Sequence, residues 1–312
     1  MKKISWFFSF ALSLLFAVQS HAQTACPPQP DLLAVIKRAK PENSKDAGFL
    51  WEIERNGRVS HLYGTMHILP EKLFLPGRKT VLALQSSDFL ALEINILDPA
   101  MLSDFKAEIK RAPDIMKPTQ AQQDTLVQLA KKFCVDTESL GGYPWSYKYM
   151  QVFVSQVRSA GFEVAFGREI SLSILATEWK KPILSLESAK TQVEALTAKW
   201  DARTPQIDKY LADMENGSAN RVMTSMLNIW ANNQLDKLDA IDSWCECKDD
   251  DFQKRLIANI NDDRNSAMAA EIDRQHLSGK KVFAAVGALH MTGSYALPKL
   301  MQQKGYVVRR VF

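Results

Sequence analysis

Two runs of alternating large apolar residues flank the pair Asn56-Gly57. Asn-Gly supplies the two positive φ angles of a tight hairpin turn, so residues 49–63 are expected to form a β-hairpin. The second strand of this hairpin leads directly into the tetrapeptide Gly64-Thr65-Met66-His67. This tetrapeptide is therefore expected at the exit of a strand.

Short apolar runs farther along the chain predict more strands. Residues 88–95 contain such a run, which ends in Glu93, and residues 182–187 contain another, which ends in Glu187. Residues 282–286 are a third apolar run, followed by Gly-Ala-Leu-His. Continuous apolar runs of this length are typical of strands covered by helices. The expected fold class is therefore α/β, with a helix-covered mixed sheet.

Helical patterns fill most of the sequence between these strands. From about residue 99 to residue 244 the pattern is mainly helical, and residues 252–276 and 294–304 are also expected to form helices. A chain of this length can bury one large core, although single cores tend to stop growing near this size. Residues 99–160 are therefore interpreted as a mainly helical insertion or lobe on one α/β domain.

The first 22 residues have the pattern of a cleavable export signal. Two lysines precede an apolar run, and Ser20-His21-Ala22 follows with the small residues that a signal peptidase needs. We expect a mature chain that begins near Gln23 and forms one domain, residues 23–312, in the periplasm or outside the cell. A lipid anchor on Cys26 is the competing interpretation. No later apolar stretch reaches the about 20 residues that a membrane-spanning helix needs.

The charges are close to balanced. The formal net charge is +4 over 312 residues, and lysines and arginines are interleaved with acidic residues. Proteins that bind nucleic acid gather their basic residues into a patch or stripe that meets the phosphates. The sequence therefore argues against nucleic acid as a partner.

Four cysteines, Cys26, Cys134, Cys245 and Cys247, follow the predicted signal. An even number in an oxidising compartment favours disulfides, for which three pairings are possible. Cys245 and Cys247 could instead form half of a metal site, but structural zinc sites usually place two or more residues between the thiols and need a second pair. We expect at least one disulfide.

The pattern Gly-x-x-His occurs twice, at residues 64–67 and 287–290, each time directly after an apolar strand. In open α/β sheets the carboxyl ends of the strands line the crevice that binds ligands. If the two strands are parallel neighbours, His67 and His290 should face the same crevice. The motif alone is weak, because a single histidine at a strand end is more often a structural residue.

Several other short segments accompany the two motifs. They are Leu92-Glu93, Leu186-Glu187 followed by Gln192, Asp263-Arg264-Asn265, and Gly305-Tyr306. Together with Tyr63-Gly-Thr-Met-His-Ile and Val286-Gly-Ala-Leu-His-Met-Thr-Gly, they resemble the TraB/GumN family, which is related to the TIKI secreted metalloproteases. The resemblance covers most of the chain, and residues 99–160 carry little of it.

The resemblance implies an α/β fold in which both Gly-x-x-His motifs and a strand-end glutamate hold a divalent metal ion for peptide-bond hydrolysis. By position, these ligands are His67, His290 and Glu93. The chain departs from the family pattern at Gly167-Arg168-Glu169, where Glu169 stands in place of an aspartate. Without the resemblance, Glu93 would more simply be a solvated acid at a strand end.

Two neutral imidazoles and a carboxylate suit a borderline divalent ion such as Zn²⁺, Mn²⁺ or Co²⁺, and they leave a position for water. Hydrolysis also needs a proton acceptor, for which Glu187 is the first candidate and Glu169 the second. Arg264 could stabilise an anionic intermediate, with Gln192 and Asn265 supporting the site. The alternative is that Arg264 forms an ion pair and that Asn265 is a helix-surface amide.

Three other features are open to two interpretations. Gly64 and Gly287 could let the chain leave its strands at unusual dihedral angles and pass close to a ligand, or could form tight packing turns. The aromatic cluster at residues 143–149 could be a substrate platform, although a Pro-Trp entry to a packed helix is commoner. The acidic run at residues 249–251 suits a solvated helix start better than a calcium site.

Two functions from different classes are consistent with these residues. The first is an exported metal-dependent hydrolase that acts on a peptide or another small molecule. The second is a periplasmic protein without catalytic activity that uses the same crevice to bind a metal ion, a haem-like ligand or a peptide. A binding protein needs the two histidines but no proton acceptor, so the effect of Glu187→Gln on activity and on metal binding separates the two.

Overall fold

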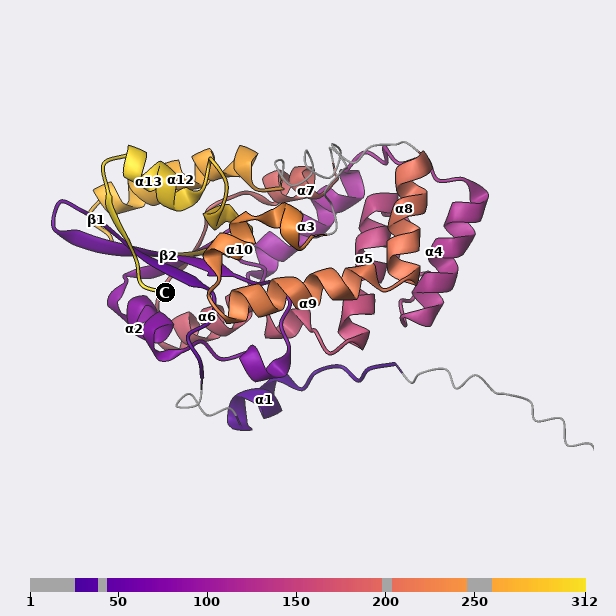
Figure 1. Ribbon diagram of the computed structural model, residues 1–312, viewed down its shortest axis with the longest axis horizontal. Coiled ribbons are helices and arrows are strands. Elements are labelled where there is room, and N and C mark those ends of the chain that lie inside the picture. Colours follow the sequence, from indigo (N-terminus) through magenta and orange to yellow (C-terminus); the bar gives the residue numbers. More distant parts are fainter. Residues whose placement is uncertain (1–25, 39–43, 198–203, 246–259) are drawn as a thin grey trace, which may run out of the picture.

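The computed structural model describes residues 26–38, 44–197, 204–245 and 260–312. Within these ranges the chain forms one six-stranded mixed sheet with helices packed around it, and further helices extend to one side (Figure 1). The predicted fold class is confirmed. The predicted export signal, residues 1–22, lies outside the described residues.

The strands of the sheet lie in the order β4-β3-β5-β2-β1-β6. Neighbouring strands are parallel from β4 to β2, whereas β1 is antiparallel to both of its neighbours. Five strands, all except β1, therefore run in the same direction and end at the same edge of the sheet. The strands are β1 (Phe49–Arg55), β2 (Arg58–Thr65), β3 (Phe89–Leu92), β4 (Ile183–Ser185), β5 (Val282–Gly287) and β6 (Val307–Arg310).

The predicted hairpin is formed by β1 and β2. Asn56 and Gly57 have φ angles of 55° and 70°, which is the pair of positive values that a two-residue primed turn requires. The register runs from Arg55 opposite Arg58 to Phe49 opposite Gly64. The turn thus aligns the hairpin so that its second strand ends in the first Gly-x-x-His motif.

The two strands that precede the Gly-x-x-His motifs, β2 and β5, are parallel neighbours. Gly64 lies opposite Val286, and Thr65 lies opposite Gly287. The two motifs therefore leave the sheet beside each other, as the crevice hypothesis requires.

Helices lie on both sides of the sheet, with α12 and α13 on one side and α2 and α6 on the other (Figure 1). The α-helices are α1 (Leu32–Arg38), α2 (Arg78–Ser86), α3 (Pro99–Arg111), α4 (Gln120–Lys132), α5 (Trp145–Ser159), α6 (Arg168–Glu178), α7 (Ala189–Thr197), α8 (Thr204–Glu215), α9 (Ser218–Ala231), α10 (Leu235–Asp239), α12 (Asp262–Leu277) and α13 (Leu297–Gln303). Single 3₁₀ turns are η2 (Glu71–Leu73), η3 (Val164–Phe166), η4 (Ile241–Ser243) and η5 (Ala288–Met291).

Two helix predictions need correction or restriction. The last helix was expected over residues 294–304, but α13 begins only at Leu297. Ala296 is still extended, and Pro298 occupies the first turn, where proline is tolerated because its missing N–H has no helical partner there. The helix expected over residues 252–276 corresponds to α12, and its predicted beginning, with the acidic run 249–251, lies outside the described residues.

A second hydrophobic cluster lies among α4, α5 and α8, apart from the core around the sheet. Trp145, the first residue of α5, is buried in it directly after Pro144. The helix-packing interpretation of the aromatic cluster is therefore confirmed for this tryptophan. The cluster draws on residues 99–160 and also on α8, so the helical lobe is closed by a later segment of the chain.

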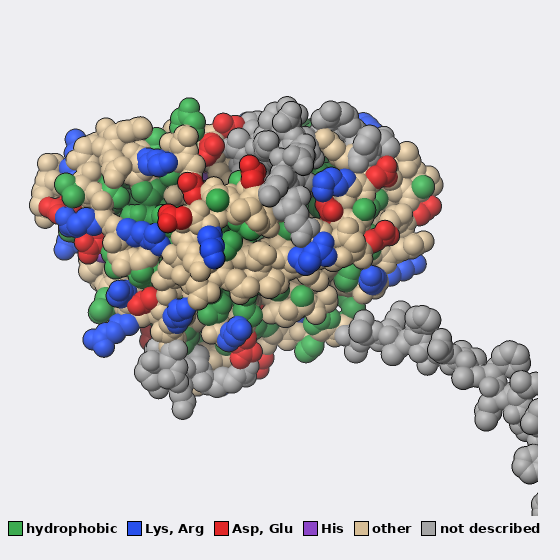
Figure 2. Space-filling view, viewed as in Figure 1, with side chains coloured by type: hydrophobic (Ala, Val, Ile, Leu, Met, Phe, Trp, Pro, Cys, Tyr) green, Lys and Arg blue, Asp and Glu red, His purple; other side chains and the backbone are tan. Residues whose placement is uncertain are grey.

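A disulfide joins Cys26 to Cys134, which follows the end of α4. Cys245 is also disulfide-bonded. The prediction of at least one disulfide is confirmed, and it indicates an oxidising compartment. No helix of the described ranges is long and apolar enough to span a membrane. Basic and acidic side chains are interspersed on the face shown in Figure 2, without a basic stripe.

Candidate functional site

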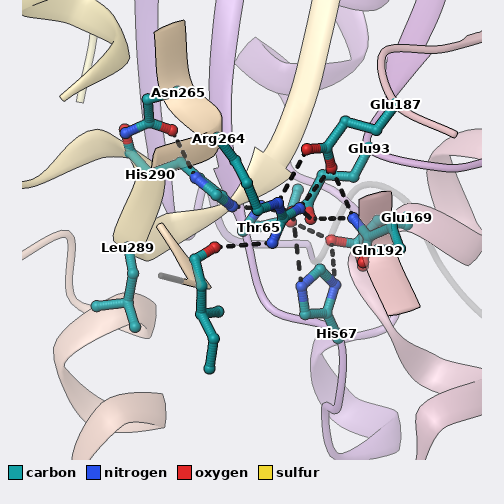
Figure 3. A network of polar contacts seen from close by, with 12 residues as sticks. Thr65, His67, Glu93, Glu169, Glu187, Gln192, Arg264, Asn265, Leu289 and His290 are labelled. Atoms are coloured by element: carbon teal, nitrogen blue, oxygen red, sulfur yellow. Dashed lines mark hydrogen bonds and ion pairs between the residues drawn. The ribbon is translucent and has the colours of Figure 1, made fainter. Parts of the chain in front are cut away.

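The residues singled out from the sequence meet at the edge of the sheet where the parallel strands end (Figure 3). They come from seven different elements, and the sheet topology places these elements side by side. His67 follows β2, Glu93 follows β3, Glu187 follows β4, His290 lies in η5 after β5, Glu169 lies in the first turn of α6, Gln192 lies in α7, and Arg264 and Asn265 lie in the first turn of α12.

Glu93 occupies the centre of this group and is buried. Its Oε1 accepts a hydrogen bond from the backbone N–H of Gly287 at 2.7 Å. Its Oε2 accepts hydrogen bonds from Nε2 of Gln192 at 2.8 Å and from Nη2 of Arg264. One oxygen of the carboxylate therefore faces the end of β5, and the other is held by two side chains.

Both histidines turn a ring nitrogen toward the same oxygen of Glu93. Nε2 of His290 lies 3.6 Å from Oε1 of Glu93, and Nε2 of His67 lies 3.8 Å from it. The two ring nitrogens cannot be farther apart than these two distances combined, which is below the ~8 Å at which sharing one ion becomes impossible. Burial by itself would raise the pKa of Glu93, but the two imidazoles and Arg264 hold this pKa well below its ordinary value.

The ring of His290 is oriented by Asn265. The amide Nδ2 of Asn265 donates to the backbone carbonyls of His290, at 3.3 Å, and Tyr295, at 2.9 Å. Its Oδ1 must therefore be the atom that lies 2.6 Å from Nδ1 of His290, and an acceptor there requires that Nδ1 carry the proton. With Nδ1 occupied in this way, Nε2 is the ring nitrogen that faces Glu93.

The ring of His67 is oriented by Glu169 in the same way. Nδ1 of His67 lies 2.9 Å from Oε1 of Glu169, which also accepts a hydrogen bond from the hydroxyl of Thr65. The negative charge of Glu169 raises the pKa of His67 to about 9. Because the His67 side chain is 60% exposed, water screens this interaction. For Glu169, burial would raise the pKa, but His67 and Thr65 lower it below its ordinary value.

Arg264 and Glu187 form a buried ion pair. Nε of Arg264 donates to Oε1 of Glu187 at 2.9 Å, and Nη2 donates to Oε2 at 2.5 Å, so the pairing is bidentate. Nη1 donates to the backbone carbonyl of Ile260, and Nη2 also reaches Glu93. Glu187 further accepts from Gln192 at 2.8 Å. Despite burial, the two carboxylates raise the pKa of Arg264.

The glycines of the two motifs allow other atoms to pack closely against the backbone, and they do not adopt unusual dihedral angles. Neither Gly64 nor Gly287 has a positive φ, and Gly287 has φ −50° and ψ 139°. The prediction of special dihedrals is therefore wrong. A Cβ on Gly287 would instead lie 3.2 Å from Nε2 of His67 and 3.3 Å from Oε1 of Glu93. Glycine keeps this space free between the two side chains.

The donor atoms of the site do not have the spacing of a metal-bound set in this structure. No three histidine, cysteine, aspartate or glutamate side chains of the described ranges are placed to hold a metal ion. Ligand atoms that share a tetrahedral zinc lie roughly 3.3 Å apart, whereas the Nε2 atoms of His67 and His290 lie 3.8 and 3.6 Å from Oε1 of Glu93. The site residues are assembled and oriented, but each histidine nitrogen lies a few tenths of an ångström farther from the carboxylate oxygen than two ligands of one ion would.

The structure thus brings together every residue that the sequence singled out for the site. It also adds Thr65, which was quoted within the first motif but given no role. Thr65 is the last residue of β2 and lies only two positions before His67, and this closeness was the available signal. The alternative interpretation of Arg264 as an ion-pair partner matches its contacts, whereas Asn265 is buried and does not lie on the helix surface.

The fold and the site define an α/β protein with a cluster of histidines and carboxylates at the carboxyl ends of parallel strands. Residues 49–310 match the TraB/PrgY/gumN family, and the chain belongs to this family. It is 22% identical over 247 residues to the uncharacterized protein YbaP of Shigella flexneri, a match that covers 78% of this chain and 88% of that protein. No solved structure matches the chain.

Proposed function

We propose that the protein is a divalent-metal-dependent hydrolase that cleaves peptide bonds, with His67, His290 and Glu93 as the metal ligands. The observation that carries the proposal is the orientation of the two histidines. Their Nδ1 atoms are occupied by Glu169 and Asn265, while both Nε2 atoms face one oxygen of Glu93.

The donor set fits a metal ion of this kind. Histidines that bind metals almost always donate their second ring N–H to a carboxylate or another oxygen acceptor, which sets the tautomer and the direction of the ring. His67 and His290 each have such an acceptor, at 2.9 and 2.6 Å. The space that Gly287 leaves between His67 and Glu93 also suits an additional atom. A shift of a few tenths of an ångström would bring each histidine nitrogen to ligand spacing from Oε1 of Glu93.

When bound, a divalent ion supplies Lewis-acid polarisation of a substrate carbonyl and activation of water. The residues of the chain must take up the proton. Glu187 has a side chain that is only 2% exposed, and both of its oxygens accept hydrogen bonds from Arg264. Glu169 is 16% exposed beside the exposed ring of His67. We therefore assign the proton acceptor to Glu169, and Glu187 to holding Arg264.

Arg264 is better suited to positioning Glu93 than to stabilising an anionic intermediate. All three of its nitrogens donate to oxygens of the chain, so it would have to leave a buried carboxylate to reach a substrate. Breaking such a pair is costly in a low-dielectric site. In its observed position Arg264 keeps Glu93 ionised, which a ligand for a cation requires.

The same contacts favour a second candidate, a metal- or peptide-binding protein without catalytic activity. Such a protein needs His67, His290 and Glu93 but no free carboxylate, and both Glu187 and Arg264 are fully engaged in ion pairs. The peptidase assignment rests on the relation to the TIKI proteases that the resemblance to the TraB/GumN family implies. The disulfide between Cys26 and Cys134 supports an exported protein acting on exported or extracellular peptides.

The test is elemental analysis of the protein purified from the periplasm, followed by a peptide-library cleavage assay with and without chelator. The hydrolase proposal expects about one divalent ion per chain, loss of the ion in His67→Ala and in His290→Ala, and cleavage that chelator abolishes. Glu169→Gln should keep the ion and lose cleavage. Glu194→Gln, an exposed glutamate on α7, serves as the matched control and should change neither.

The outcomes separate the two candidates. Metal bound by His67 and His290 without cleavage of any peptide would favour the binding protein. A wild-type protein that binds no divalent ion at micromolar concentration would overturn the hydrolase and the metal-binding form of the second candidate.

A further inference from the structure

Arg168, the residue before Glu169, is completely buried, with 0% of its surface exposed. Its Nη1 donates to the backbone carbonyl of Phe74 at 2.9 Å, and its Nη2 donates to the carbonyl of Leu73 at 2.8 Å. No carboxylate of the described ranges forms an ion pair with it. A buried charge without an ion-pair partner is costly. The hydrogen bonds to the carbonyls of Phe74 and Leu73 offset part of this cost, and they tie the guanidinium to this segment of the backbone.

These two carbonyls lie at the end of η2, on the loop that follows His67. The backbone N–H of Arg168 also donates to the carbonyl of Met66 at 3.0 Å. Arg168 therefore hydrogen-bonds to both ends of the loop of residues 66–74. Its backbone N–H binds the beginning of the loop, and its side chain binds the end. Gly167 fits beneath the loop, because a Cβ there would lie only 2.4 Å from the carbonyl oxygen of His67.

The guanidinium also connects this loop to the first residue of the motif. It lies 5.3 Å from the ring centroid of Trp230 in α9, within the range of a cation–π contact. The indole N–H of Trp230 donates to the carbonyl of Gly64 at 2.9 Å. Within the tetrapeptide from Gly64 to His67, Trp230 thus binds the carbonyl of Gly64, and the backbone N–H of Arg168 binds the carbonyl of Met66.

We infer that Arg168 is a positioning residue for His67: it fixes the loop of residues 66–74 against the start of α6, so that Nδ1 of His67 meets Oε1 of Glu169. The opposite histidine is held independently, because Asn265 belongs to α12. Each imidazole is thus oriented by a residue of a different helix, His67 by Glu169 of α6 and His290 by Asn265 of α12. The role of His67 as a ligand rests on the proposed function, but its orientation by Arg168 is testable in the metal-free protein.

The planar fork of arginine is what the two carbonyls need. A lysine in this place keeps the charge but donates from a single nitrogen, and a methionine keeps the length but donates nothing. The loop should therefore loosen in the order wild type, Arg168→Lys, Arg168→Met. Arg168→Lys is the main variant, since Arg168→Met leaves two buried carbonyls without donors and could unfold the chain.

The experiment uses the full-length mature protein, kept metal-free with chelator and labelled with ¹⁵N-histidine. The ring nitrogens of His67 and His290 are observed through their carbon-bound protons, at one fixed pH. Arg168→Lys should move the ring-nitrogen shifts of His67 toward those of a free imidazole and leave those of His290 in place. Asn265→Ala is the matched control and should do the reverse. Amide exchange in residues 66–74 should also become faster in Arg168→Lys.

If Arg168 has only a general structural role, Arg168→Lys should change the ring-nitrogen shifts of both histidines or of neither. Either result overturns the inference. Metal titration is read separately. If the wild type binds a divalent ion, Arg168→Lys should bind it about 10–100-fold more weakly, as is usual when a support of a metal-binding histidine is lost. If the wild type binds none, the proposed function fails, while the response of the His67 ring still decides the inference.

Discussion

Nδ1 of His290 lies 2.6 Å from Oδ1 of Asn265, and the same amide donates to two backbone carbonyls. This arrangement leaves one orientation for the amide and one tautomer for the neutral imidazole. Nε2 is thereby the ring nitrogen that faces Oε1 of Glu93, the same oxygen that accepts the N–H of Gly287. A buried asparagine at the start of α12 thus decides which nitrogen of His290 is available.

Asn265→Ala should weaken divalent-metal binding by about 10–100-fold, because the ring of His290 loses the acceptor that sets its tautomer. The measurement is competition with a chelator of known affinity. Asn232→Ala, an exposed asparagine after α9, is the control and should bind metal like the wild type. Equal affinities in Asn265→Ala and the wild type would contradict the assigned role.

Arg264→Met should destabilise the fold by about 3–5 kcal/mol, because it leaves the buried carboxylates of Glu93 and Glu187 without their cation. Urea-induced unfolding at neutral pH measures the change. Adding Glu187→Gln to Arg264→Met should recover part of the loss, since one of the two uncompensated charges is removed. Arg274→Met removes the arginine of an exposed pair with Glu271 and should have little effect.

The local signals in the sequence are sufficient for five of the six strands and for the position of the first motif, whereas β6 was not predicted as a strand. Asn56-Gly57 determines the hairpin by local sterics, and the apolar runs that became β3 and β5 can be buried only within a sheet. The convergence of His67 and His290 followed from the general rule about strand ends, once β2 and β5 were taken as neighbours.

The contacts between the elements could not be read from the sequence in the same way. Asn265 meets His290 across 25 residues, Glu169 meets Thr65 across 104, and Trp230 meets Gly64 across 166. Such pairs depend on how helices dock on the sheet, and no local periodicity encodes this docking. For the same reason, the sequence leaves Arg264 open between a role toward a substrate and an ion pair, whereas in the fold two carboxylates engage it.

Replacing both Cys26 and Cys134 by serine should destabilise the fold by about 2–5 kcal/mol, because the disulfide closes a long loop and restricts the unfolded chain. The two residues are separated by 108 positions. Urea-induced unfolding of the variant and the wild type, both without reductant, measures the difference. Reductant is avoided because Cys245 is also disulfide-bonded. A variant as stable as the wild type would show that the unfolded chain is already compact around this loop.

His276 connects α12 to three strands through a chain of hydrogen bonds. The backbone N–H of Val282 donates to Oγ of Ser60 at 2.9 Å, so the hydroxyl of Ser60 is free to donate to Nδ1 of His276 at 2.8 Å. Nε2 of His276 then carries the proton and donates to the carbonyl of Arg55 at 3.1 Å. In the charged imidazolium both ring nitrogens donate, so Ser60 would have to accept a second hydrogen bond and turn its hydroxyl proton away from His276.

Protonation of His276 should therefore destabilise the fold at acidic pH. Burial is the largest effect and lowers the pKa of His276 below its ordinary value of 6.5; Arg58 adds to it, while Asp273 opposes it. Above about pH 6.5 the residue is neutral in both the folded and the unfolded chain, so its contribution is fully present. As the pH falls below this value, the unfolded chain binds the proton first, and stability is lost until the lowered pKa of the folded state is reached.

Other acidic and basic groups titrate as well, so the quantity to measure is the difference in unfolding free energy between the wild type and His276→Gln. This difference should be smaller at about pH 5.5 than at about pH 7.5. A difference that stays constant or grows toward acidic pH would mean that His276 is charged in the folded protein.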